Sequence, residues 1–144
     1  MAQHDELLQQ LIRDAGMRVT RARVTVMRLL TRTDRPVSHA DVTKALSEDG
    51  WDRATLYRNL IALTDAGLLR RVDMGDHVWR FERVSEQHED QEQEHPHFLC
   101  TACGEVSCLP ELKLQMPAAT IPRALSNGQV SIQLRGICDG CFQL

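Results

Sequence analysis

Aromatic residues and long apolar runs are both scarce in this sequence. Only six of its 144 residues are Phe, Trp or Tyr, which leaves a thin core for the length. Small domains with thin cores often depend on a metal or a partner subunit for stability. No stretch approaches the roughly 18 consecutive apolar residues of a membrane-spanning helix, so we expect a protein without a membrane segment.

The N-terminus also lacks a basic segment followed by an apolar one. We therefore expect no secretory signal and a cytoplasmic location. The sequence contains no nucleophile with a partnered base, no phosphate-binding loop and no open-site zinc motif. These absences argue against an enzyme and against a small-molecule substrate.

Positive and negative charges are distributed unevenly along the chain. The formal net charge is -3, but residues 1–83 carry +2 and residues 84–144 carry -5. Between Met17 and Arg35, six arginines stand against one acid, Asp34. Such a basic stripe is typical of a surface that contacts phosphates. A solvated helix face would have the same composition, and charge alone does not decide between them.

Apolar spacing and capping residues predict four helices in the first half of the chain. They are residues 5–15 before Gly16, the segment from Thr20 to Pro36, the segment from Ser38 to Gly50, and the segment from Asp52 to Gly67. Two short alternating runs follow, Leu69–Asp73 and His77–Glu82, and the turn residues between them predict a hairpin. The last three helices and the hairpin form a winged helix-turn-helix arrangement, whose last helix would enter the major groove of DNA.

A polar stretch at Ser85–Glu94 separates this half from the rest of the chain. It has five acids and no apolar residue, so we expect a linker there. The expected domains are therefore residues 1–84 and 95–144, joined by residues 85–94.

Short strands dominate the predicted second domain. They are expected at Phe98–Cys100, Val106–Leu109 and Val130–Leu134. A helix within Leu112–Leu125 would be interrupted by Pro117 and Pro122. The predicted fold class is α+β, with a winged-helix domain first and a small α/β domain second.

Four of the five cysteines form two Cys-x-x-Cys pairs, Cys100 with Cys103 and Cys138 with Cys141. Each pair can hold one ion from a tight turn, and together they make the closed four-thiolate set of structural zinc. Disulfides or unligated core cysteines are the alternatives, but disulfides are rare in the cytoplasm. We therefore predict that Zn²⁺ holds the strand near Cys100 against the strand near Cys138.

Three stretches together carry a resemblance to a known family. They are Arg18-Val19-Thr20-Arg21-Ala22-Arg23; Ala54-Thr55-Leu56-Tyr57-Arg58-Asn59-Leu60 with Asp65-Ala66-Gly67-Leu68; and His95-x-His97-x-x-Cys100-x-x-Cys103-Gly104 with Gly136-x-Cys138-x-x-Cys141. In this order and spacing they resemble the ferric uptake regulator (Fur) family of metal-responsive repressors. The resemblance implies an N-terminal DNA-binding domain, a C-terminal dimerisation domain, a homodimer, and a double-stranded DNA operator as partner.

The resemblance also implies a second, regulatory metal site. Glu82 matches the family's acidic ligand, His95 and His97 match its two histidines, and Cys108 stands where the family usually has Asp or Glu. A thiolate there would favour Zn²⁺ or another thiophilic ion over Fe or Mn, and it would make the site oxidisable. The predicted metal is Zn²⁺, with Fe, Mn and Ni as the alternatives. The spacing of the histidines places both on one face of a strand and Cys100 on the other. Alternatively, the histidines are solvated and Cys108 is a core residue.

One family position departs from the expected pattern. Pro36 stands where the family often has a sensor histidine, and proline has no side-chain ligand atom. His39 lies three residues further on and is a candidate substitute. The sequence leaves open whether His39 or Cys108 is a ligand and which metal is the physiological one.

The same resemblance indicates which residues contact DNA. Arg18 matches a residue that enters the minor groove. Near the start of the helix after Asp52, where recognition helices meet base edges, lie Arg53, Thr55, Tyr57 and Arg58. Tyr57 can pack on a thymine methyl group, and Arg58 can reach phosphate or guanine. The alternatives are a Tyr57 packed against a neighbouring helix and an Arg58 in an exposed salt bridge.

These observations favour a cytoplasmic, homodimeric, metal-responsive repressor. One Zn²⁺ would hold the dimerisation domain together, and a second metal would fix the angle between the domains. A metal that binds better to the state with the DNA-competent angle raises the DNA affinity of the protein by that difference in metal affinity. Two other functions fit the same sequence: a redox- or peroxide-sensing repressor, and a zinc-stabilised DNA-binding dimer without metal sensing.

Overall fold

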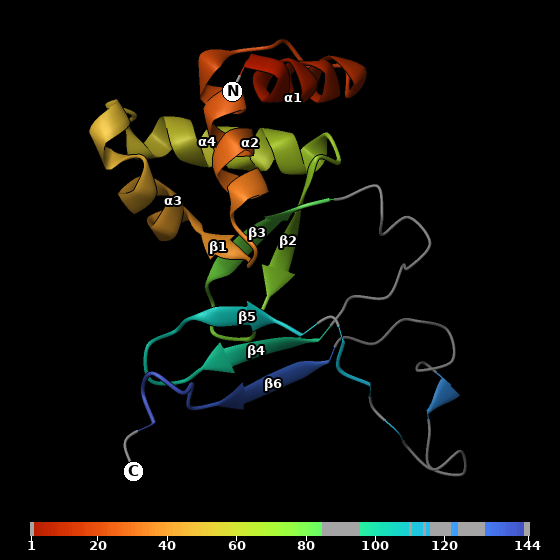
Figure 1. Cartoon of the computed structure of the whole chain (residues 1–144), viewed down its shortest axis with the longest axis vertical. Helices are drawn as coiled ribbons and strands as arrows, with labels where there is room; N and C mark the ends of the chain where they lie inside the picture. Colours follow the sequence, from red (N-terminus) through yellow and green to blue (C-terminus); the bar gives the residue numbers. More distant parts are fainter. Residues whose placement is uncertain are drawn as a thin grey trace. The chain divides into compact units, whose positions relative to one another are not determined.

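The computed structural model of the chain describes residues 2–84, 96–109, 111–113, 115, 122–123 and 132–142. The chain forms two compact units, Met1–Val84 and Ser85–Leu144, which we describe one at a time (Figure 1). The predicted linker at residues 85–94, His95 and most of the predicted Leu112–Leu125 helix lie outside the described residues. None of the described helices is both long and apolar enough to cross a membrane.

Four helices make up most of the first unit, as predicted. They are α1 (Ala2–Asp14), α2 (Arg21–Arg32), α3 (His39–Ala45) and α4 (Arg53–Asp65), with a short 3-10 helix at Ser47–Asp49. Thr20, Ser38 and Asp52 each accept a hydrogen bond from the backbone N–H three residues on, at 3.3, 3.1 and 2.7 Å. Asp41 completes a capping box by accepting from the Ser38 N–H at 2.9 Å. The predicted caps are therefore confirmed, and they explain where α2, α3 and α4 begin.

A small antiparallel sheet completes this unit, in the order β1-β3-β2. Its strands are β1 (Val37–Ser38), β2 (Leu69–Asp73) and β3 (Trp79–Arg83). The predicted hairpin is confirmed, because Leu69 pairs with Arg83 and Asp73 with Trp79. The second hairpin strand starts two residues later than predicted, since His77 has a φ of 63°, a left-handed conformation that interrupts a strand.

One apolar core holds the helices and the sheet of this unit together. α4 contributes three fully buried leucines along one face, Leu56, Leu60 and Leu63. The same helix contacts α2, α3 and β2, which fixes its position from three sides. Helices α2, α3 and α4, followed by the β2–β3 hairpin, make the predicted winged helix-turn-helix.

The second unit is built on a three-stranded sheet in the order β5-β4-β6. Its strands are β4 (His97–Cys100), β5 (Val106–Cys108) and β6 (Gln133–Gly136). β5 runs antiparallel to β4, and β6 runs parallel to it. The two units together confirm the predicted α+β class.

The position of β6 corrects the predicted strand Val130–Leu134. Pairing with β4 places Gln133 opposite His97 and Gly136 opposite Cys100, so the strand runs two residues past its predicted end. Val130 and Ser131 lie outside the described residues. A Cβ atom at Gly136 would lie 3.2 Å from the Phe98 ring, which favours glycine there. The register with β4 decides the limits of this strand, and a local pattern of apolar residues does not contain that information.

Leu7 and Leu8 are neighbours on α1 and provide a matched pair of substitutions. Leu8 is fully buried, whereas Leu7 is 53% exposed. We expect Leu8→Ala to lower the free energy of unfolding by about 2–5 kcal/mol, because it leaves a cavity in the core. Leu7→Ala should change it by about 0.5 kcal/mol or less. Urea unfolding followed by circular dichroism measures both, and equal losses would show that α1 does not share the core.

Candidate metal centre and nucleic-acid interface

Both Cys-x-x-Cys pairs lie in tight turns of the second unit. Cys100 ends β4, and the chain turns through Cys103 towards β5, with the Gly104 N–H donating to the Cys100 carbonyl at 2.9 Å. Gly104 has a φ of 75°, a conformation that favours glycine. Cys138 and Cys141 lie in the turn after β6, where the Cys141 N–H donates to the Cys138 carbonyl at 3.0 Å. The parallel pairing of β4 with β6 brings the two turns together.

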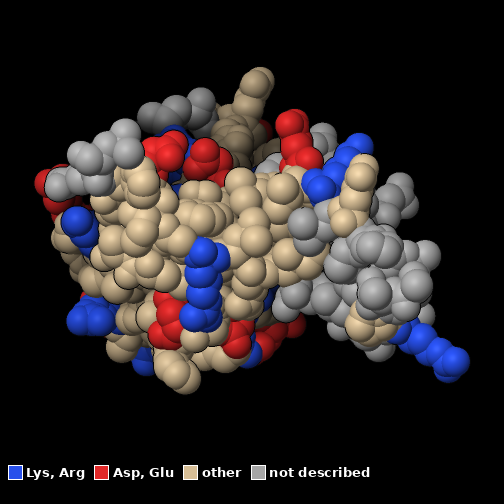
Figure 2. Space-filling view, turned by 90° about the horizontal axis from the view of Figure 1, so that it is seen from below, with Lys and Arg blue, Asp and Glu red and all other residues tan. Residues whose placement is uncertain are grey.

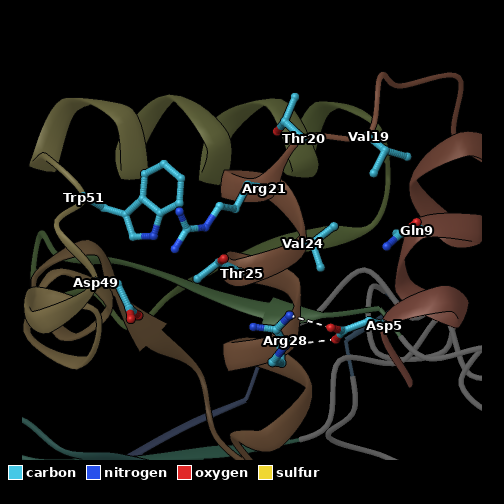
Figure 3. Close-up of a pocket in the computed structure, with 10 residues that line it drawn as sticks. All are labelled: Asp5, Gln9, Val19, Thr20, Arg21, Val24, Thr25, Arg28, Asp49 and Trp51. Atoms are coloured by element: carbon cyan, nitrogen blue, oxygen red, sulfur yellow. Dashed lines mark hydrogen bonds and ion pairs between the residues drawn. The ribbon is translucent and has the colours of Figure 1, made fainter. Parts of the chain in front are cut away.

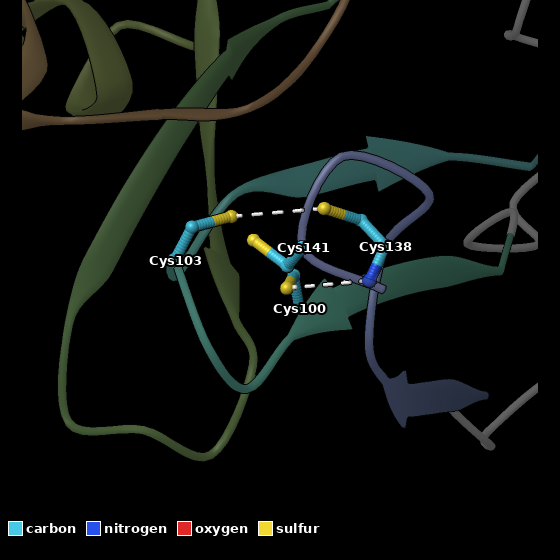
Figure 4. A group of neighbouring side chains, drawn as sticks. All are labelled: Cys100, Cys103, Cys138 and Cys141. Carbon is cyan, nitrogen blue, oxygen red and sulfur yellow. Dashed lines mark hydrogen bonds between the residues drawn. The ribbon is translucent and has the colours of Figure 1, made fainter. Parts of the chain in front are cut away.

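The four cysteine side chains converge on one point (Figure 4). Their Sγ atoms all lie within 4.8 Å of one another, and those of Cys103 and Cys138 are 3.9 Å apart. A tetrahedral zinc ion with Zn–S distances of about 2.3 Å has sulfur atoms about 3.8 Å apart. The cluster therefore fits a zinc ion. None of the five cysteines forms a disulfide, so the disulfide alternative has no support.

Backbone groups and neighbouring thiols determine the ionisation of this cluster. Backbone N–H groups of Cys103 and Cys138 lower the pKa of Cys100 to about 6, and the Cys138 nitrogen lies 3.4 Å from the Cys100 sulfur. Hydrogen bonds with the Cys138 and Cys103 thiols, together with burial, raise the pKa of Cys141 to about 12. Four thiolates around one point repel each other, and a divalent cation compensates that repulsion.

His97 and Cys108 form a second pair of ligand-type side chains in this unit. They are direct cross-strand partners in the antiparallel β4–β5 pair. Their side chains therefore share one face of the sheet, with Cβ atoms about 4.5–5.5 Å apart. Cys100 is three residues further along β4 and lies on the opposite face. One strand thus carries a member of the cysteine cluster on one face and the His97–Cys108 pair on the other.

Glu82 and His95 complete the predicted regulatory set. Glu82 lies on β3 of the first unit, where its carboxylate forms an ion pair with Arg70, its cross-strand partner on β2. His95 lies outside the described residues. That both residues share a metal with His97 and Cys108 stays a prediction.

The start of α4 presents the predicted DNA-contacting side chains to solvent. Arg53, Tyr57 and Arg58 are exposed, and Tyr57 retains 46% of its accessible surface. The Asp52 carboxylate organises this turn, because it accepts from the Thr55 hydroxyl at 2.6 Å and from the Thr55 N–H at 2.7 Å. The Thr55 hydroxyl accepts from Arg58 at 3.3 Å. These bonds to Thr55 lower the pKa of Asp52, which keeps its carboxylate ionised at neutral pH.

The predicted basic stripe is partly engaged within the first unit. Arg28 forms a bidentate pair with Asp5 of α1, at 2.8 and 3.0 Å, and Arg21 packs over the Trp51 ring. These four residues help to line a pocket of about 390 Å³ (Figure 3). Arg18 is exposed. The face shown in Figure 2 mixes both signs of charge, and its described side chains form no basic patch that would attract DNA there.

The sequence reasoning missed two contacts between helices. One is the Asp5–Arg28 pair. The other involves His39, a candidate metal ligand from the sequence, which donates from Nε2 to the Arg53 carbonyl at 2.8 Å and lies against the Tyr57 ring. Tyr57 is therefore both exposed and in contact with a neighbouring helix. This bears out the alternative that Tyr57 packs against a neighbouring helix. The partner residue was not predicted, because no local pattern indicates how two helices face each other.

Comparison with known proteins gives a consistent result. Residues 14–135 match the sequence profile described as "Ferric uptake regulator family". The "Ferric uptake regulation protein" of Legionella pneumophila is 31% identical over 137 residues, covering 92% of this chain and 96% of the relative. The homologue from Neisseria meningitidis serogroup C is 28% identical over 137 residues, covering 90% of each.

Solved structures of the same kind share the fold. The ferric uptake regulator of Vibrio cholerae aligns with a TM-score of 0.67 and 27% identity, covering 90% of this chain and 98% of that one. The regulator of Pseudomonas aeruginosa, solved with manganese, aligns with a TM-score of 0.60 and 25% identity, covering 92% and 98%. The similarity therefore spans both units.

The geometry of the cysteine cluster predicts one firmly held metal per chain. We expect protein dialysed against a mild chelator to retain about one Zn²⁺, and Cys138→Ser to lose it because one of four thiolates is gone. Atomic emission spectroscopy measures the metal content. Cys108→Ser is the matched control, since Cys108 lies outside the cluster, and it should keep the zinc. Loss from both variants, or from neither, would contradict the assignment.

The pKa values predict how zinc binding depends on pH. In zinc-free protein near neutral pH, Cys100 (pKa about 6) is a thiolate, whereas Cys141 (pKa about 12) holds its proton. Zinc must displace that proton, so zinc affinity should rise with pH. A pH indicator in weak buffer measures the protons released on zinc addition. At neutral pH the wild type should release at least one proton for each zinc ion bound, and zinc binding without proton release would refute the expectation.

Proposed function

This chain belongs to the ferric uptake regulator family over residues 14–135, and we propose that it is a metal-responsive transcriptional regulator. In this proposal it binds double-stranded DNA as a homodimer and represses the genes it controls. The observation that carries this proposal is the exposed set Arg53, Tyr57 and Arg58 on the first turns of α4. The other face of α4 is buried through leucines, so the helix offers these side chains as one surface.

The chemistry of this surface suits the major groove. An arginine such as Arg58 can donate to guanine or phosphate oxygens, and the Tyr57 ring can pack on a thymine methyl group. Arg18 and Arg53 would contact the backbone or the minor groove, where positive charge adds affinity without sequence readout. A homodimer carries two such helices, so it would bind an operator with two-fold symmetry and half-sites about 34–36 Å apart.

The four cysteines are assigned the structural role. A zinc ion bound by four thiolates has no open coordination position. Such a site is typical of structural zinc and not of catalytic zinc. Support comes from the converging sulfur atoms and from the short sheet whose strands β4 and β6 lead into the two cysteine turns. We therefore propose a binding protein without enzymatic activity, whose second unit carries the dimer contacts.

His97 and Cys108 are assigned to the regulatory metal, with Glu82 and His95 as the further predicted ligands. The support is their direct cross-strand pairing. An imidazole and a thiolate both suit Zn²⁺, whereas Mn²⁺ and Fe²⁺ accept oxygen ligands more readily. Occupancy would raise DNA affinity to the extent that the metal binds the DNA-competent state better than the other state.

Metal titration of DNA binding tests the regulatory assignment. The probe is a duplex selected from a random-sequence pool by the zinc-loaded wild type. Fluorescence anisotropy should show that added zinc raises the affinity of chelator-treated protein by about 5–150-fold. His97→Ala and Cys108→Ser should lose most of that gain.

Ser107→Ala is the matched control for these variants. Ser107 is the exposed neighbour of Cys108 on β5 and points to the other face of the sheet, so its loss should leave the response to zinc intact. An unchanged response in Cys108→Ser would remove this thiolate from the site. A wild type whose affinity no metal alters would refute metal sensing altogether.

A substitution on α4 tests the DNA surface. Arg58→Ala should weaken binding to the selected duplex by about 1–3 kcal/mol and should relax its sequence preference. Arg13→Ala is the control, because it removes the same exposed charge from the end of α1. Competition with a scrambled duplex measures the preference. If both variants lose the same affinity and keep the same preference, Arg58 contributes only charge.

A further inference from the structure

His39 occupies a place that the assignments above do not use. It is the first residue of α3, directly after the Ser38 cap. The capping box of Ser38 and Asp41 fixes the backbone at this point, so the direction of the His39 side chain is set by the start of the helix. That direction is towards α4, as its two contacts show.

The first contact is a hydrogen bond to the beginning of the recognition helix. His39 Nε2 lies 2.8 Å from the carbonyl oxygen of Arg53. A carbonyl only accepts, so Nε2 carries the proton in this bond. In an α-helix that carbonyl also accepts from the N–H four residues on, which here belongs to Tyr57. The bond therefore attaches α3 to the turn of α4 that carries Tyr57.

The second contact is to the Tyr57 side chain itself. The two ring centroids are 5.3 Å apart with an interplanar angle of 58°, a tilted arrangement that aromatic pairs favour. Tyr57 is 46% exposed, so a large part of its surface is open to solvent. His39 thus contacts both the backbone turn and the ring of one residue.

We propose that His39 is a positioning residue for DNA binding, which holds the Tyr57 ring on the exposed face of α4 in the orientation that meets the major groove. The proposal rests on the proposed function, because it gives Tyr57 a base to contact. Without His39, the exposed ring would sample several rotamers and lose that freedom only on binding, which lowers affinity. Thr55 and Arg58 are held by hydrogen bonds at the start of α4 itself, whereas Tyr57 is contacted from another helix.

A double-mutant cycle on the full-length, zinc-loaded protein tests the proposal. The probe is the duplex selected from a random pool by the wild type. His39→Ala should weaken binding about threefold to tenfold, the equivalent of one aromatic contact. In a Tyr57→Ala background, the same substitution should have no further effect, because the residue it acts through is gone. Equal losses in both backgrounds would overturn the proposal, since His39 would then act by its own phosphate contact or through general stability.

Two further variants separate the hydrogen bond from the ring contact. His39→Asn keeps a donor for the Arg53 carbonyl and removes the ring, whereas His39→Phe keeps a ring and removes the donor. Each should lose part of the affinity, and the two losses should together account for that of His39→Ala. If His39→Ala folds poorly, these two variants still test the proposal. Full affinity in both would overturn the proposal.

A measurement without DNA distinguishes failure of this inference from failure of the proposed function. Tyr57 is the only tyrosine of the chain, so ¹³C-tyrosine labelling yields a single set of ring resonances. The wild type should show an Overhauser contact between the His39 and Tyr57 rings, and His39→Ala should shift the Tyr57 resonances. His4→Ala, a histidine exposed on α1, should leave them in place. Absence of the contact in the wild type overturns the inference, whereas a pool that yields no duplex overturns the proposed function and the inference with it.

Discussion

The meeting of two distant cysteine turns is the constraint around which the second unit is arranged. Thirty-four residues separate Cys103 from Cys138, and the β4–β6 pairing returns the chain so that the two Cys-x-x-Cys turns meet. Among its described residues, the buried apolar side chains are few: Pro96, Leu99, Cys100 and Val106. So small a core contributes little free energy of folding. A metal that joins the ends of a long loop compensates for this, because it removes closure entropy from the unfolded chain.

The alternation of side chains along β4 gives this cross-link a second consequence. Cys100 lies on the face of the cysteine cluster, while His97 lies on the other face opposite Cys108. The two sets of side chains therefore lie on opposite faces of the sheet although only two residues separate His97 from Cys100. A metal bound at the end of β4 would also hold the strand that carries His97. The proposed regulatory pair would then lie on a strand whose position is already fixed.

Local signals predicted a large part of this structure. Some features depend only on residues that are close in sequence, and these were predicted correctly. They are the caps Thr20, Ser38 and Asp52 and the strand Leu69–Asp73. Cysteine spacing likewise predicted a cluster, since few arrangements of two Cys-x-x-Cys turns serve anything but a metal. The errors lie where pairing between strands decides: β1 exists only because Val37 pairs with Phe81, and β6 runs two residues past its predicted end through its register with β4. The contact of His39 with Tyr57 was missed because it needs the crossing of α3 and α4.

The first turns of α4 illustrate how an exposed surface can be ordered without a core. Arg53, Tyr57 and Arg58 are exposed and long, so each would lose rotamer freedom when it binds a partner. The Asp52 carboxylate reduces that loss for Arg58 through the Thr55 hydroxyl, and the His39 ring reduces it for Tyr57. Both Asp52 and Ser38 are caps, so the residues that start α4 and α3 also determine the directions of the side chains beside them. The polar groups that begin the two helices therefore also orient the side chains that would contact DNA.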